Sequence, residues 1–236
     1  LPRGFSFDQG CQFLGNYETA YHCLVARGAL RAGETVLIHG ASGSTGLAAV
    51  HLAKLVGARV IATGRSAEKL AVVKSQGADE VIDIRGDGPS GVRSFRDDVK
   101  ALTDGRGVDV VYDGVGGDVN LETLRCVAFG ARFLIVGWAA TPFVARGRGE
   151  RGAPRANMLP TNLIMMKGLD VLGCPTVIST HHDPSIRATR LGQLLEWAEA
   201  GRIAPYVAAS FPLGEVKAAM RAKWSSQFVG GLVLHP

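Results

Sequence analysis

Residues 35–46 read TVLIHGASGSTG, and this stretch determines the fold expected for the chain. Its first five residues, rich in β-branched and apolar side chains, predict a short buried strand, and the glycine-rich continuation predicts a turn. Apolar residues then recur at helical spacing from Ser44 to Val56, and Gly57 ends that helix. The stretch therefore predicts a strand–turn–helix unit with glycines at the turn.

The same alternation continues along most of the chain. Further strands are expected at residues 59–63, 80–82, 108–112, 132–136 and 169–173, with helices at 66–76, 95–102 and 119–127. Strands that are almost continuously apolar are typical of a parallel sheet covered by helices on both faces. The predicted fold class is therefore α/β, with an open, doubly wound parallel sheet.

The pattern changes beyond residue 175. A long helix is expected at 186–200, followed by short elements at 206–209, 213–221 and 231–234. These elements do not extend the alternation, so they indicate a second structural unit.

Composition excludes several classes of protein. The 236 residues are 47% hydrophobic and 20% charged, with a net charge of +5, which is typical of a globular chain. No apolar run approaches the roughly 18 residues that a membrane span needs. The four cysteines form no C-x-x-C pair, which excludes a zinc ribbon and predicts reduced, mostly buried thiols. No leader peptide is visible after Leu1, so we expect a cytoplasmic protein.

The turn carries the pattern G-x-x-G-x-x-G at Gly40, Gly43 and Gly46. Glycine permits a tight turn and lets a pyrophosphate approach the backbone, while the first-turn N–H groups of the following helix attract its charge. A glycine triplet alone is weak evidence, but the strand–turn–helix–strand context favours a dinucleotide site. A turn required only for packing is the alternative.

The end of the next strand indicates which dinucleotide binds. NAD-binding proteins usually carry an acidic residue there, yet residues 59–66 contain none. Arg65, 19 residues after Gly46, offers a planar guanidinium to a 2′-phosphate, and Lys69 follows Ser66 by about one helical turn. We expect NADPH to bind at least about tenfold more tightly than NADH, or about 1.4 kcal/mol. A solvated Arg65 is the alternative.

Four segments then carry a resemblance to known proteins: NYETAY at 16–21, GETVLIHGASG at 33–43, GADEVI at 77–82 and VGGLVL at 229–234. With them the chain resembles the medium-chain dehydrogenase/reductase superfamily, and within it the zinc-free NADPH:quinone oxidoreductase (zeta-crystallin-like) branch. The resemblance implies a Rossmann domain at residues 16–175. It also implies that residues 1–15 and 176–236 are the remnant of a chaperonin-10-like catalytic barrel domain, most of which is absent here.

The resemblance further implies which residues contact the cofactor. Residues 42–45 would face the pyrophosphate, residues around Arg65 the 2′-phosphate, and residues 136–138 the nicotinamide. Relatives often stack a Tyr on the adenine where this chain has Ile84. The implied set is Gly40, Ala41, Ser42, Gly43, Ser44, Thr45, Gly64, Arg65, Ser66, Lys69, Gly114, Val136, Gly137 and Trp138. No residue is assigned to catalysis or to a metal.

The expected function is NADPH-dependent hydride transfer to a quinone or an α,β-unsaturated carbonyl compound, in a homodimer formed through residues 169–173. A zinc-type alcohol dehydrogenase or an enoyl reductase of the same superfamily is the first alternative. A non-catalytic NADPH-binding or RNA-binding module is the second, resting on the arginine-rich residues 145–152, where we favour a loop over the cleft. His181 and His182 are expected on a solvated loop and do not predict a metal site.

Overall fold

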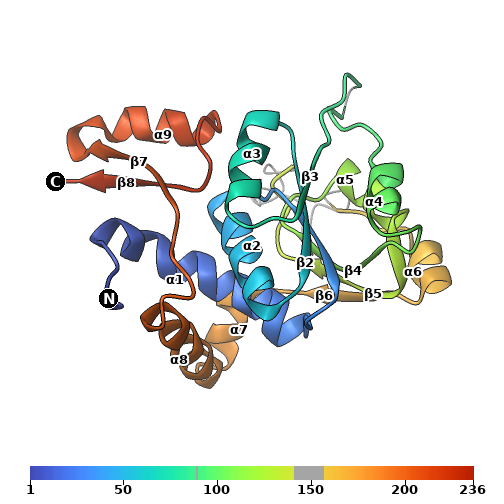
Figure 1. Ribbon diagram of the computed structural model, residues 1–236, viewed down its shortest axis with the longest axis horizontal. Helices are drawn as coiled ribbons and strands as arrows, with labels where there is room; N and C mark the ends of the chain where they lie inside the picture. The colour runs from blue at the N-terminus through green and yellow to red at the C-terminus, as the bar shows by residue number, and fades with distance from the viewer. Residues whose placement is uncertain (89, 141–156) are drawn as a thin grey trace, which may run out of the picture.

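A six-stranded parallel sheet forms the centre of the computed structural model, which describes residues 1–88, 90–140 and 157–236 (Figure 1). The strand order is β3-β2-β1-β4-β5-β6, so the direction of winding reverses between β1 and β4. The predicted doubly wound α/β fold is thereby confirmed. The strands are β1 (Thr35–His39), β2 (Arg59–Gly64), β3 (Glu80–Asp83), β4 (Val108–Asp113), β5 (Val127–Ile135) and β6 (Asp170–Gly173).

Helices cover both faces of the sheet. They are α1 (Phe7–Tyr21), a π-helical turn (His22–Arg27), α2 (Ser44–Val56), α3 (Ala67–Ser75), α4 (Arg96–Leu102), α5 (Asp118–Leu124) and α6 (Thr161–Lys167). Because side chains alternate along a strand, Val36 and Ile38 join the core beneath α1 and α2, while Leu37 joins the core that contains Val99 of α4 and Val119 of α5. This two-sided burial explains the almost continuous apolar strands.

Helix α1 was not expected from the sequence. It begins with a capping box, in which the Ser6 hydroxyl accepts from the Gln9 N–H and the Gln9 side chain accepts from the Ser6 N–H. Phe13, Tyr17 and Ala20 are buried in the core that α1 shares with α2. The helix runs continuously across residues 15–16, where the sequence analysis placed a domain boundary.

Two local expectations were wrong. The helix expected to reach residue 127 ends at Leu124, because Val127 pairs with Val108 and already belongs to β5. His181 and His182 do not lie on a loop but in the last turn of α7 (Thr176–His182). The N–H of Ser179 donates to the Pro175 carbonyl and closes the first turn of that helix.

The segment that the sequence predicts to be a second unit contains α8 (Ser185–Glu199), β7 (Val207–Pro212), a 3-10 turn (Leu213–Glu215), α9 (Val216–Trp224) and β8 (Gly231–His235). β7 and β8 pair in parallel in a separate two-stranded sheet, set beside α1 in Figure 1. The N–H of Gly230 donates to the Ser42 carbonyl at 2.8 Å, so this unit touches the glycine turn directly. Within the described ranges, no helix has both the length and the apolar character that a membrane span requires.

Candidate functional site

A cleft of about 1550 Å³ opens beside the turns that follow β1, β2, β3 and β4. These turns lie at the carboxyl ends of the strands, around the point where the strand order reverses. Open α/β sheets bind their ligands at this place. The described residues that line the cleft fall mainly in 40–43, 63–70, 84–86, 90–92, 115–121, 139–140 and 158–160, with Ser225 and Ser226 from the second unit.

The glycines of the turn after β1 have different roles. Gly40 has a φ of +65°, which a side chain would strain. A Cβ on Gly46 would lie 2.4 Å from the Gly40 carbonyl oxygen, so only glycine lets α2 pack this closely on the turn. Gly43 has an ordinary φ of −78°, and a Cβ there would meet nothing nearer than 3.4 Å. Gly40 and Gly46 are therefore required for the geometry of the turn, whereas Gly43 leaves space for a ligand to approach the backbone.

The first turn of α2 has backbone N–H groups without an intrahelical acceptor, and Gly43, directly before it, lines the cleft. The first backbone bond of the helix runs from the Leu47 N–H to the Gly43 carbonyl, at 2.8 Å. The N–H groups of Ser44, Thr45 and Gly46 therefore precede the intrahelical ladder. Together with the positive end of a 13-residue helix, they suit an anion such as a pyrophosphate.

Three of the residues expected to contact the cofactor direct their side chains elsewhere. Ala41 is fully buried in the core. The Thr45 hydroxyl donates to Asn16 Oδ1 at 3.1 Å, and the Ser44 hydroxyl accepts from Lys223 Nζ at 3.3 Å. These three residues offer only their backbone to a ligand in the cleft.

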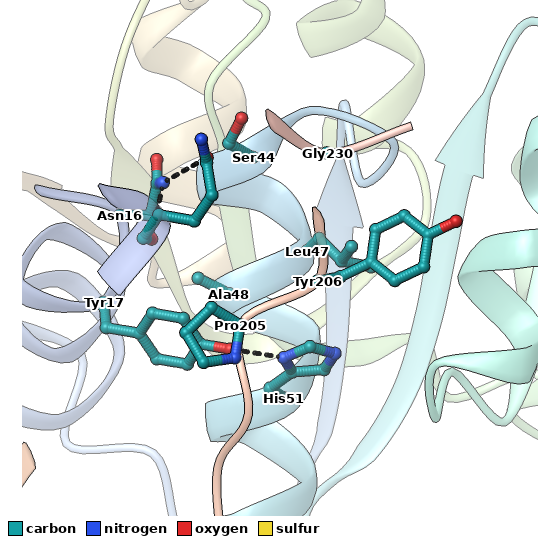
Figure 2. Close-up of a pocket in the computed structure, with 10 residues that line it drawn as sticks. Asn16, Tyr17, Ser44, Leu47, Ala48, His51, Pro205, Tyr206 and Gly230 are labelled. Atoms are coloured by element: carbon teal, nitrogen blue, oxygen red, sulfur yellow. Dashed lines mark hydrogen bonds between the residues drawn. The ribbon is translucent and has the colours of Figure 1, made fainter. Parts of the chain in front are cut away.

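Ser44 lines a second, very small cavity between α1, α2 and the segment at Pro205 (Figure 2). Its volume of about 10 Å³ leaves room for one water at most. Beside it, the Tyr17 hydroxyl lies 2.6 Å from His51 Nδ1, and burial raises the pKa of Tyr17. The contact between Tyr17 and His51 joins α1 to α2, and the cavity beside it is too small for a ligand.

The end of the cleft beside β2 and β3 carries cationic side chains from Arg65, Lys69 and Arg85. Ser66 is the N-cap of α3, as predicted, and its hydroxyl accepts from the Lys69 N–H at 3.4 Å. Asp118, at the start of α5 beyond β4, is the one carboxylate among the described lining residues. We call this cationic part of the cleft the β2–β3 end.

The opposite part, which we call the β4–β5 end, is built from backbone. The N–H groups of Val136 and Gly137 both donate to the Asp113 carbonyl, at 2.8 and 3.2 Å. A Cβ on Gly137 would lie 3.2 Å from the Gly114 carbonyl oxygen, so the two chain segments pack closely. Gly114, Val136 and Gly137 thus support the lining residues 139–140, while Trp138 is 46% exposed.

The carboxyl group of Asp113 holds the turn that lines this end. It is fully buried, and its Oδ1 accepts from the N–H groups of Val115 and Gly116, both at 2.9 Å. Burial raises the pKa of Asp113. Asn157 accepts from the Gly117 N–H at 3.1 Å and so ties the wall at residues 158–160 to the same turn.

His39, the last residue of β1, connects β2 with α5 through its two ring nitrogens. Its Nδ1 lies 2.7 Å from the Thr63 hydroxyl and its Nε2 lies 2.8 Å from the Thr123 hydroxyl. The Thr123 hydroxyl donates to the Val119 carbonyl, so it accepts from His39 and places the imidazole proton on Nε2. Burial lowers the pKa of His39 to about 3, so the ring is neutral at physiological pH.

Sequence reasoning missed several lining residues. The residues 90–92 and the wall at 158–160 carried no recognisable motif, whereas the glycines at 114–117 did give a signal. Arg85 directly follows Ile84, the position compared with the adenine-stacking Tyr of relatives, but it was assigned no role. The arginine-rich stretch 145–152 lies outside the described residues. Among the residues that are described, no three His, Cys, Asp or Glu side chains gather as a metal site would require.

The sheet order and the glycine turn at the cleft define a doubly wound α/β protein with a site of the nucleotide-binding type. Residues 44–183, more than half of the chain, match the family described as zinc-binding dehydrogenase. The chain belongs to this family, and the resemblance to the medium-chain dehydrogenase/reductase superfamily is confirmed.

The names of individual relatives are more specific than the description of the family. The chain is 33% identical over 237 residues to a quinone oxidoreductase-like protein 2 homolog of Nematostella vectensis, covering 100% of this chain and 60% of the relative. It is 30% identical over 218 residues to quinone oxidoreductase-like protein 2 of Bos taurus, covering 92% and 57%. The chain thus spans about 60% of the length of these relatives. Among solved structures, the quinone oxidoreductase of Thermus thermophilus, also solved with NADPH, superposes with a TM-score of 0.79 at 28% identity, covering 100% of this chain and 69% of that one.

Proposed function

We propose that the cleft binds NADPH and that the protein is an oxidoreductase that reduces a quinone or an α,β-unsaturated carbonyl compound. NADPH, when bound, supplies a hydride to the substrate. The observation that carries the proposal is the β2–β3 end, where Arg65 and Lys69 line the cleft and residues 59–66 contain no acid. The names of the relatives, and the Thermus structure solved with NADPH, support the choice of cofactor and substrate class.

Different residues of the chain would bind different parts of the cofactor. The N–H groups at the start of α2 would hold the pyrophosphate, and the guanidinium of Arg65 would bind the 2′-phosphate in a bidentate contact. At the β4–β5 end, the small side chains of Ala139 and Ala140 leave room for a flat ring against backbone. These residues bind and orient the cofactor, and we assign the proton donor to none of them.

The domain division and the assembly are part of the same proposal. Residues 16–175 would form the nucleotide-binding domain, and residues 1–15 and 176–236 would belong to the catalytic domain. β6 is the edge strand of the sheet and pairs only with β5 among the described strands. Pairing of residues 169–173 with a second copy would extend the sheet into a homodimer and cover that edge.

Dissociation constants for NADPH and NADH test the proposal. We expect the unmodified protein to prefer NADPH at least about tenfold, and Arg65→Ala to abolish this preference by weakening NADPH alone. Lys74→Ala is the matched control, because this substitution removes a charge from α3, the helix that follows Arg65, and Lys74 pairs with Glu80 outside the cleft. A ratio that Arg65→Ala leaves unchanged would contradict the assignment.

A further inference from the structure

We infer that Arg85 is a positioning residue that determines cofactor specificity by holding the backbone of Arg65 in place; the inference rests on the proposed binding of NADPH. The guanidinium of Arg85 donates twice to the Arg65 carbonyl oxygen, from Nε at 2.9 Å and from Nη2 at 2.6 Å. Both arginines line the same end of the cleft. The two arginines are 20 positions apart in the sequence, so the sequence alone does not reveal this contact.

The double contact fixes the point from which the Arg65 side chain starts. Just before it, the Ile84 N–H donates to the Gly64 carbonyl at 2.9 Å, which continues the pairing of β2 with β3. The contact with Arg85 then orients the peptide group that leads from Arg65 into Ser66, the N-cap of α3. A planar guanidinium sets this orientation with two donors, whereas a lysine ammonium would act as a point charge.

Arg85 is itself held by a short hairpin, which we define as residues 84–86 and 90–93. Arg85 bridges Val92 in antiparallel fashion, and the Gly86 N–H donates to the Gly91 carbonyl at 3.2 Å. The Arg85 N–H also donates to Asp83 Oδ1 at 2.9 Å. On the returning limb, a Cβ built on Gly91 would lie 3.7 Å from Arg65 Nη1, so this limb passes close to the Arg65 guanidinium. One limb thus anchors the Arg65 backbone, and the other passes close to the Arg65 guanidinium.

The charges at this end match a dianion. Arg65, Arg85 and Lys69 bring three positive groups to one end of the cleft, and Asp118, the one described lining carboxylate, lies beyond β4. Such like charges repel each other unless an anion lies between them. A ribose 2′-phosphate carries the required charge, and a ribose 2′-hydroxyl does not.

The test compares NADPH and NADH dissociation constants for Arg85→Gln and for the matched control Arg93→Gln. Arg93 belongs to the same hairpin and also donates to a backbone carbonyl, that of Asp83 at 2.7 Å, but it does not line the cleft. We expect Arg85→Gln to weaken NADPH about tenfold and NADH less than about twofold, or about 1.4 against 0.4 kcal/mol. Arg93→Gln should leave the ratio of the two constants unchanged.

Arg85→Lys separates positioning from charge. It retains the positive charge but lacks the paired donors, so we expect it to lose most of the preference for NADPH, as Arg85→Gln does. Full retention of the preference in Arg85→Lys would show that charge alone matters and would overturn the positioning role. Equal weakening of NADPH and NADH in Arg85→Gln would overturn it too, because a purely structural role predicts that result.

The two proposals fail in different ways. If the unmodified protein prefers NADPH and Arg85→Gln keeps that preference, the role of Arg85 is overturned and the proposed function stands. If the unmodified protein binds neither NADPH nor NADH, the proposed function is overturned and the role of Arg85 with it. Thermal unfolding of each variant, measured beside the binding, confirms that the binding constants come from folded protein.

Discussion

The two ends of the cleft expose different chemical groups. The β2–β3 end presents long cationic side chains, Arg65, Lys69 and Arg85, whereas the β4–β5 end presents glycine backbone and the small side chains of Ala139 and Ala140. Side-chain charge recognises a phosphate, while closely packed backbone provides shape and excludes water. Under the proposed function, the β2–β3 end would select the cofactor, and the β4–β5 end would accommodate its reactive ring.

The largest expected effect concerns the close packing of α2 on the turn after β1. In Gly46→Ala, the added Cβ would lie 2.4 Å from the Gly40 carbonyl oxygen and 2.8 Å from Ala41 Cα, so α2 must shift. We expect the free energy of unfolding to fall by about 3 kcal/mol, measured by chemical denaturation. In Gly43→Ala the Cβ meets only an ordinary contact, so the loss should stay below about 1 kcal/mol. Equal losses in both variants would contradict the distinct roles of these glycines.

The next effect concerns His39, which joins β2 to α5. Its folded-state pKa of about 3 lies below the ordinary value of 6.5, so below pH 6.5 the unfolded chain takes up a proton that the folded chain does not. The stability that His39 contributes is complete above pH 6.5 and is lost as the pH falls toward 3. At pH 5 the loss should reach about 2 kcal/mol, at about 1.4 kcal/mol per pH unit.

Comparison with His39→Gln isolates this contribution. The difference in unfolding free energy between the two proteins should change with pH between about 6.5 and 4, because all other titrating groups are shared. Chemical denaturation at several pH values measures it. A difference that stays constant over this range would show that His39 takes up a proton in the folded state as readily as in the unfolded chain.

A smaller effect is expected at the β2–β3 end. Lys69→Gln removes one of its three cations, and we expect NADPH to bind about fivefold more weakly, or about 1 kcal/mol, with NADH unchanged. Titration of protein fluorescence with each dinucleotide measures both constants. Weaker binding of NADH by the same factor would place Lys69 at the pyrophosphate instead of the 2′-phosphate.

The smallest effect is expected at the β4–β5 end. Burial raises the pKa of Asp113, so ionisation of its carboxyl destabilises the fold as the pH rises through that raised pKa. Asp113→Asn keeps an oxygen for the N–H groups of Val115 and Gly116 and removes this titration. At about pH 8 we expect the free energy of unfolding of the variant to equal that of the original protein or to exceed it by up to about 0.5 kcal/mol. A large loss of stability under these conditions would show that the carboxylate charge itself holds the turn.

How far the sequence predicted this molecule depends on the distance between interacting residues. The β1–α2–β2 unit was predicted almost residue by residue, because its strand, glycine turn and helix follow from neighbours in the chain. The Ser66 cap and the position of Arg65 at the cleft follow for the same reason. The early start of β5 was missed, because it depends on pairing of Val127 with Val108.

The rest depended on contacts between distant segments. Arg85 reaches the Arg65 carbonyl only because β3 lies beside β2 and the hairpin then folds back. His39 was expected to be a strand residue, and nothing in the sequence places Thr63 and Thr123 at its two ring nitrogens. The capping box of α1, by contrast, involves residues close in sequence, Ser6 and Gln9, and could have been predicted but was not.

Calorimetric titration with the two adenosine fragments of the cofactors tests the central claim most directly. Adenosine 2′,5′-bisphosphate carries the 2′-phosphate that the β2–β3 end should recognise, and adenosine 5′-monophosphate lacks it. We predict that the bisphosphate binds at least about tenfold more tightly, or about 1.4 kcal/mol, and that raising the salt concentration reduces this difference. Equal affinities for the two fragments, or no binding of either, would contradict the account.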